Sequence, residues 1–181
     1  MKWPLAIAAV VWCVLVALCA RELYAYETTP GATVAAPDGW PDGTALRRGA
    51  GFTLIMFVHP DCPCSRASLA ELREIAETPG ASPTIEIVFV GGGGDGRSWD
   101  LAGRVRRAER VLDPRGAEAA RFGALTSGDV VVYAPHGQLA FSGGITGSRG
   151  HVGDNVGRRQ VLAVLRGDQA QTTHAVFGCA L

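Results

Sequence analysis

Two cysteines separated by one proline, Cys62 and Cys64, are the residues of this sequence best suited to chemistry. They lie where an apolar run ends and a helical pattern begins. A helix N-terminus offers unpaired N–H groups and a positive dipole, and both stabilise a thiolate. Pro63 fits the first helical position, because its missing N–H would have no intrahelical partner there. This arrangement predicts a nucleophilic or metal-binding sulfur site.

The elements that must position these sulfurs are a strand before them and a helix after them. Residues 52–58 form an apolar run typical of a strand covered on both faces. Apolar residues then recur at helical spacing over 65–77, and Pro79-Gly80 ends this pattern. The same reading predicts further strands at 84–90, 110–113, 129–133 and 138–142, and helices at 98–110, at 114–122 and from Asp154 or Asn155 to 166.

This order of elements predicts an α/β fold. Strands joined by helices imply right-handed parallel crossovers. The last two strands form a hairpin around residues 134–137, which adds antiparallel pairs. We therefore expect a mixed central sheet with helices on both faces.

The N-terminal segment is long and apolar. Residues 3–20 would span about 27 Å as a helix, close to the thickness of a bilayer core. Leu18 occupies a position where a cleavage site needs a small residue, which favours a retained anchor over a cleaved signal peptide. The bias of basic residues keeps the N-terminus in the cytoplasm. We expect a single-pass inner-membrane protein with an anchor (1–22), a linker (23–43) and a folded domain (44–181) on the periplasmic, or extracytoplasmic, side.

This placement changes how the five cysteines count. Cys13 and Cys19 fall in the membrane segment, whereas Cys62, Cys64 and Cys179 are exported to a compartment that allows disulfides. Because three is odd, at least one thiol is left free, bound to metal or paired with another molecule. The segment after the last helix ends in apolar residues and is expected to fold back, which would make Cys179 a resolving cysteine. With 17 basic and 17 acidic residues and no basic stripe, nucleic acid is not an expected partner.

The sequence resembles the thioredoxin-like superfamily over about residues 44–166. The likeness rests on the strand that enters a cysteine-bearing helix start, on Val111-Leu-Asp-Pro-Arg-Gly with Arg-Phe-Gly123, and on the Val-Val-Val-Tyr-Ala-Pro-His-Gly hairpin. More narrowly, His59-Pro-Asp-Cys-Pro-Cys-Ser65 and the glycine-rich segment 142–151 resemble the membrane-anchored RedB-like group. The resemblance implies a thioredoxin-like fold and thiol–disulfide exchange with an exported protein that carries a disulfide or thiol.

Two departures from the family pattern affect the site. The family motif is Cys-x-x-Cys, so placing Cys62 on the nucleophile position puts Ser65, not a cysteine, on the resolving position. The family usually has a cis-proline facing the cysteines, where this sequence has Ser127 or Gly128. In the family that proline helps to keep metal away from the cysteines, so its absence leaves room for metal.

Thiol–disulfide exchange without a cofactor is the first expectation. Cys62 attacks a disulfide as a thiolate, and Cys64 or Cys179 resolves the mixed disulfide. A disulfide across a single proline would be strained and therefore oxidising. Supporting roles are expected for His59, Pro63, Ser65, Ser127, Gly128, Arg149 and His151.

A metal module is the alternative, binding or delivering copper or zinc through Cys62, Cys64 and His151, since thiolates with imidazole suit these metals. Further candidate ligands are His59, His174 and Cys179. A peroxiredoxin-type peroxidase is disfavoured, because His59 and Ile55 stand where that family wants a hydroxyl residue and a proline.

Overall fold

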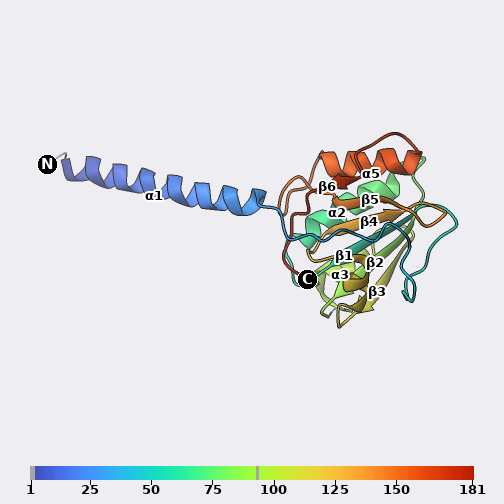
Figure 1. The fold of residues 1–181 in the computed structure, drawn as a ribbon. Coiled ribbons are helices and arrows are strands. Elements are labelled where there is room, and N and C mark those ends of the chain that lie inside the picture. Colours follow the sequence, from blue (N-terminus) through green and yellow to red (C-terminus); the bar gives the residue numbers. More distant parts are fainter. Residues whose placement is uncertain (1–2, 93) are drawn as a thin grey trace.

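The computed structural model describes residues 3–92 and 94–181, as one long helix followed by an α/β domain (Figure 1). The sheet of the domain has six strands in the order β3-β2-β1-β4-β5-β6. The elements in chain order are α1 (Trp3–Thr28), β1 (Thr53–Val58), α2 (Ser65–Glu77), β2 (Thr84–Val90), α3 (Gly96–Ala102), β3 (Ala108–Asp113), α4 (Ala117–Phe122), β4 (Asp129–Tyr133), β5 (Leu139–Gly144), α5 (Val156–Arg166) and β6 (Thr173–His174).

The sheet is mixed, as predicted. Strand β1 pairs in parallel with β2 and antiparallel with β4, and β4 and β5 form the expected antiparallel hairpin. All residues of β1 are buried, which explains its continuous apolar run. The central position of β1 means that its end, where the cysteines follow, is fixed from both sides.

Helices cover both faces of the sheet. Apolar residues of α2, α3 and α5 pack on one face, in a cluster with Leu54, Met56 and Phe89. The other face carries α4 and an aromatic group in which Trp40 lies 5.6 Å from Phe122 between ring centroids. Trp40 belongs to the stretch that we expected to be a linker, so this part of the stretch packs against the domain.

The predicted helix 98–110 is wrong at its C-terminal end. Helix α3 ends at Ala102, and Ala108–Asp113 pairs in parallel with β2 as strand β3. A left-handed residue, Arg107 (φ 58°), turns the chain between the two elements. Pairing along the edge of β2 therefore outweighs the local helical pattern, as tertiary contacts commonly do.

Polar side chains accept the free N–H groups at the starts of α4 and α5, from Asp113 before the Gly116 N-cap of α4 and from the N-cap Asn155 of α5. The Asp113 carboxylate accepts hydrogen bonds from the backbone N–H groups of Ala117, Glu118 and Ala119, so α4 begins three residues later than predicted. At α5 the cap is Asn155, whose side chain accepts from the Arg158 N–H at 2.8 Å. This settles the choice that the sequence left between Asp154 and Asn155.

Helix α1 projects from the domain with its surface exposed (Figure 1). Its 26 residues would be about 39 Å long. Its most apolar window has a mean hydropathy of 2.4, so by length and composition the helix could cross a membrane, and a signal sequence would have the same properties.

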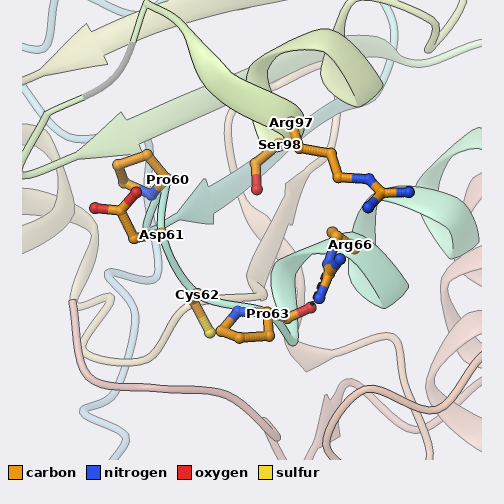
Figure 2. Close-up of a pocket in the computed structure, with 7 residues that line it drawn as sticks. All are labelled: Pro60, Asp61, Cys62, Pro63, Arg66, Arg97 and Ser98. Carbon is orange, nitrogen blue, oxygen red and sulfur yellow. Dashed lines mark hydrogen bonds between the residues drawn. The ribbon is translucent and has the colours of Figure 1, made fainter.

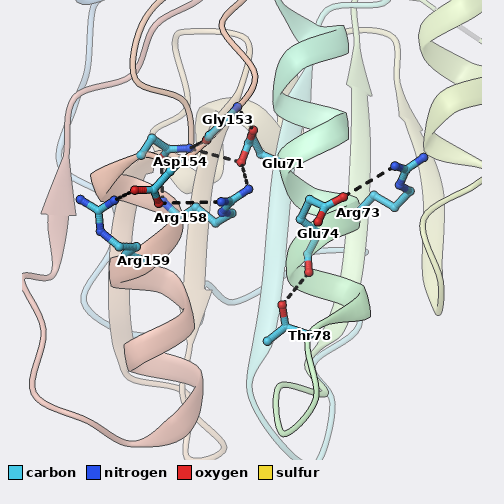
Figure 3. Close-up of polar contacts among 9 residues, drawn as sticks. Glu71, Arg73, Glu74, Thr78, Gly153, Asp154, Arg158 and Arg159 are labelled. Carbon is cyan, nitrogen blue, oxygen red and sulfur yellow. Dashed lines mark hydrogen bonds and ion pairs between the residues drawn. The ribbon is translucent and has the colours of Figure 1, made fainter.

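A buried glutamate links α2 to α5 and to the loop before α5. Glu71 has no exposed surface and receives hydrogen bonds from the Gly153 N–H (2.7 Å), Asn155 (3.3 Å) and Arg158 (2.6 Å) (Figure 3). Two residues along the same helix, Arg73 makes only half-exposed ion pairs with Glu74 and Glu77. The buried carboxylate therefore holds the loop before α5 against α2.

We expect Glu71→Ala to lower the free energy of unfolding by about 3 kcal/mol, because it leaves buried donors without an acceptor. Arg73→Ala is the matched control, and its cost should stay below about 1 kcal/mol because its partners are solvated. Denaturant titration of the full chain in a mild detergent measures both values. Equal losses in the two variants would contradict this role for Glu71.

Candidate functional site

Cys62 and Cys64 lie in the tight turn that joins β1 to α2. The Cys62 N–H donates to the His59 carbonyl at 3.2 Å, and the Ser65 N–H donates to the Cys62 carbonyl at 3.1 Å. Cys64 is the N-cap residue of α2, with helical backbone angles and no side-chain cap bond. Pro63 therefore precedes the helix and lies two positions before the first helical residue, Ser65, whereas the sequence predicted it at the first helical position. The turn holds both sulfurs at the positive end of α2.

The segment that follows α5 carries the third sulfur to this turn. Its backbone pairs with residues 125–127: the Ser127 N–H donates to the Cys179 carbonyl at 2.8 Å, and the Leu181 N–H donates to the Leu125 carbonyl at 3.0 Å. A Cβ atom at Gly178 would collide with the Ser127 carbonyl, so only glycine permits this approach. The segment after α5 was expected to fold back onto the domain, and the structure shows this.

The three sulfurs form one compact cluster. The Sγ atoms of Cys62 and Cys179 are 2.7 Å apart, and all three Sγ atoms lie within 4.8 Å of one another. Cys62 and Cys64 are buried, with 3% and 8% of their surfaces exposed, and Cys179 is half-buried. By contrast, Cys13 and Cys19 are exposed on α1. The thiol that contacts Cys62 therefore comes from a distant part of the chain.

Ser65 and Ser127 stabilise the turn by hydrogen bonds to His59 and to each other. Their hydroxyl oxygens are 2.8 Å apart, and Ser127 Oγ also accepts a hydrogen bond from the His59 N–H at 2.9 Å. Gly128 has φ 94° and lies so close to α2 that a Cβ atom there would be 2.7 Å from Ser68 Oγ. Ser127 and Gly128, which occupy the expected place of the family proline, therefore hold the start of α2 by hydrogen bonding and close approach.

Arg149 connects the sulfur cluster to the end of α1. Its guanidinium donates to the Gly178 carbonyl and, at 3.3 Å, to the Thr29 carbonyl, and it lies 4.9 Å from the centre of the Tyr26 ring. Arg149, one of the residues expected to support the site, lies close enough to the sulfurs for its positive charge to lower the pKa of Cys64 and Cys179 against larger opposing effects.

The histidines lie away from the sulfur cluster. His151 is exposed and lines a cavity of about 540 Å³ that also includes His174 and Arg159. The ring Nδ1 of His59 accepts from the Asp61 N–H at 3.2 Å, which supports the turn. Within residues 3–92 and 94–181, the group around Cys62 that could hold a metal consists of the three cysteines alone. The expected pairing of His151 with Cys62 and Cys64 is therefore not observed.

The three thiols differ in acidity. Burial raises the pKa of Cys62, but hydrogen bonds from the thiol and backbone N–H of Cys179, from the Cys64 N–H and from Ser65 outweigh it, and the net pKa is lowered. Burial and the charge on Cys62 raise the pKa of Cys64. Burial, the hydrogen bond to Cys62 and neighbouring charge raise the pKa of Cys179 to about 12. Cys62 is thus the most acidic of the three thiols, and the Cys179 thiol is a hydrogen-bond donor beside it.

An open cavity of about 210 Å³ adjoins Cys62 on the side of α3 (Figure 2). Arg66, from the first turn of α2, and Arg97, from α3, both line it. Neither arginine was among the site residues expected from the sequence. The only local signal was the position of Arg97 directly after the glycine-rich loop 91–96.

No protein-family model matches the sequence, and no curated protein matches it. Solved structures do resemble it. A hypothetical protein from Sinorhizobium meliloti has a TM-score of 0.59 at 18% identity, with 84% of this chain and 93% of that chain covered. An uncharacterised conserved protein from Geobacillus kaustophilus has a TM-score of 0.60 at 16% identity, with 84% and 91% covered.

A thioredoxin-like protein solved in its oxidised form has a TM-score of 0.51 at 17% identity, with 79% of this chain and 97% of that chain covered. At such identities the similarity shows the fold. The expectation of an α/β thioredoxin-like fold is therefore confirmed.

Replacing Cys179 with alanine should raise the pKa of Cys62, because the thiolate loses a hydrogen-bond donor. The measurement is the rate of Cys62 alkylation by iodoacetamide against pH, followed by mass spectrometry of the peptide that contains Cys62. The wild-type rate should reach half its maximum below pH 9.0, the ordinary value for the thiol, and the variant at a higher pH. Cys64→Ala is the comparison and should shift the profile less than Cys179→Ala, because the largest effect that lowers the pKa of Cys62 comes from the side chain of Cys179. An unchanged profile in Cys179→Ala would show that Cys179 does not stabilise the thiolate.

Proposed function

We propose that this protein is a membrane-tethered thiol–disulfide oxidoreductase in which Cys62 is the nucleophile and Cys179 resolves the mixed disulfide. The observation that carries the proposal is the 2.7 Å contact between their sulfurs, with the pKa of Cys62 lowered and that of Cys179 raised. Exchange needs a thiolate that attacks first and a second thiol within reach that stays protonated until then. The thioredoxin-like fold supports this chemistry by analogy.

The exchange proceeds in two displacements. The Cys62 thiolate attacks one sulfur of a partner disulfide, the partner S–S bond breaks, and one partner thiolate leaves. The thiol of Cys179 then transfers its proton to that thiolate, and its sulfur attacks Cys62 Sγ. The Cys62–Cys179 disulfide forms, the mixed disulfide breaks, and the second partner thiolate leaves. Two electrons have passed from the cysteine pair to the partner, and the reverse sequence oxidises a partner dithiol.

Cys64 has a secondary place in this proposal. A bridge between Cys62 and Cys64 would close a small ring around Pro63, whose own ring restricts the backbone, and such a disulfide is strained. Cys179 approaches from a separate segment, so its bridge to Cys62 carries no such restriction. Cys64 then serves as a neighbouring thiol whose backbone N–H stabilises the Cys62 thiolate.

The proposal places the domain outside the cytoplasm, at the inner membrane. Helix α1 serves as a retained anchor, and the expected partner is an exported protein with a disulfide or thiol, as in the RedB-like group that the sequence resembles. Arg149 supports this arrangement, because it bonds both to Thr29, just after α1, and to Gly178, next to Cys179. The sulfur cluster thus lies at the end of the domain where α1 joins it.

The decisive test is a trapping experiment with the full chain in detergent. Cys179→Ser should accumulate a mixed disulfide between Cys62 and a model disulfide, because a bridge to Cys64, the remaining thiol of the cluster, would be strained. The wild type should instead yield a Cys62–Cys179 disulfide, identified in non-reducing peptide maps. Cys62→Ser should form neither species. A Cys62–Cys64 bridge in the wild type, or rapid resolution in Cys179→Ser, would exclude Cys179 as the resolving cysteine.

A soft-metal site is a second candidate, favoured by the three sulfurs within 4.8 Å. Thiolates in this number suit Cu(I), or Zn²⁺ with a fourth ligand from outside the group. Metal binding would have to deprotonate Cys64 and Cys179, whose pKa values are raised. The structure therefore changes the donor set of this candidate from cysteines with His151 to three cysteines.

Cys64→Ala separates the two functions. If exchange is the function, this variant should keep most of the wild-type rate of disulfide reduction, and copper and zinc contents should be near zero in both proteins. If metal binding is the function, the wild type should hold about one metal ion per chain after purification with copper or zinc, and the variant should lose it. Elemental analysis and a disulfide-reduction assay on the same samples give both readings.

A further inference from the structure

We infer that the cavity beside Cys62 binds an anionic group of the disulfide partner through Arg66 and Arg97. This inference rests on the proposed function and specifies the substrate class of the same site. Cys62 lines the cavity, so a partner group bound there lies beside the residue that carries the nucleophilic sulfur (Figure 2). The cavity of about 210 Å³ is open to solvent and large enough for one short side chain or a small molecule.

The charge of the cavity is predominantly positive. Arg66 and Arg97 are both exposed, and Figure 2 shows Asp61 across the cavity from them, with its carboxylate directed away. The Nε of Arg66 donates to the Pro63 carbonyl at 3.3 Å, which holds the side chain beside the cysteine turn and leaves its terminal nitrogens for another acceptor.

Within the part of the chain that the structure describes, neither arginine is neutralised by an ion pair, unlike several arginines elsewhere in the domain. Arg73 pairs with Glu74 and Glu77, and Arg159 pairs with Asp154. Among the ion pairs of residues 3–92 and 94–181, none involves Arg66 or Arg97. Two arginines without ion-pair partners therefore line the cavity beside Cys62.

The chemistry of guanidinium selects the ligand. Its planar fork of donors matches a carboxylate, and such charge-assisted pairs are stronger than neutral hydrogen bonds. The substrate class is accordingly a disulfide with a carboxylate close to its sulfurs, either an acidic residue beside a cysteine of an exported protein or a small anionic disulfide. The covalent steps are those given above, and the arginines only position the partner before Cys62 attacks it.

A charge series of small disulfides tests the inference on the reduced full chain in neutral detergent. Dithiodiglycolate, hydroxyethyl disulfide and cystamine are similar in size but anionic, neutral and cationic. We expect single-turnover rate constants to fall in that order for the wild type. Arg97→Ala should slow the anionic substrate about threefold and leave the neutral one unchanged, and Arg97→Glu should reverse the order. High salt should remove most of the preference.

Arg106→Ala is the control, because this exposed arginine does not line the cavity. It should leave all three rates unchanged. Alkylation of Cys62 by neutral iodoacetamide should be unchanged in Arg97→Ala, which excludes an effect through the acidity of the thiolate. Peptide disulfides with Glu or Gln beside the cysteine complete the series, and a preference for Glu that Arg97→Ala removes assigns the carboxylate to a protein partner.

Two failures are distinguishable. If the wild type reduces all three small disulfides equally well and the Arg97 variants do not change their rates, the cavity does not select anions, and exchange through Cys62 stands. If the wild type reduces none of them, the proposed function fails and this inference fails with it.

Discussion

The backbone pairing between residues 125–127 and residues 179–181 is the interaction on which the site depends. Two hydrogen bonds and the bridge between Thr126 and Ala180 fix the last part of the chain against the segment that precedes β4. Without this pairing, Cys62 and Cys64 would be two thiols at an open helix start. With it, a third sulfur covers Cys62 and donates a hydrogen bond to its thiolate.

The same short segment also organises the N-terminal side of the domain. Thr126 Oγ1 donates to the Ala32 carbonyl at 2.7 Å, and the Gly31 N–H donates to the Val176 carbonyl at 2.8 Å. The stretch that follows α1, the turn before β4 and the final segment are thus held in one hydrogen-bonded group. Arg149 adds contacts to the first and last of these. Hydrogen bonds therefore join the segment that follows α1 directly to the final segment, which carries Cys179.

The central elements were predictable because their patterns are local. The apolar run of β1, the helical spacing of α2 and the pairing of β4 with β5 all agree with the sequence argument. The strand β3 was partly missed, because its first half looks helical and only pairing with β2 makes it a strand. Cys62 and Cys64 were identified by the same local reasoning, since a proline between two thiols at a helix start is visible in the sequence.

The remainder of the site depends on contacts that no local pattern encodes. The approach of Cys179 to Cys62 spans 117 positions, and an odd cysteine count could only raise it as a possibility. His151 was placed at the sulfurs because it ends a glycine-rich loop, but the hydrogen bond from Gly153 to Glu71 holds the chain just after that loop against α2. The cavity of Arg66 and Arg97 requires α2 and α3 to be neighbours, which follows from the packing of both helices on one sheet face.

The separation of 117 positions between Cys62 and Cys179 also has a consequence for biosynthesis. A chain made from its N-terminus contains Cys62 and Cys64 long before it contains Cys179. During that interval Cys64 is the only nearby thiol, and the strands that bury Cys62 are incomplete. An oxidant that meets the unfinished chain would therefore produce a different pairing from the Cys62–Cys179 disulfide that we propose for the folded protein. Correct maturation then depends on the order of two events, the oxidation of Cys62 and the docking of the final segment.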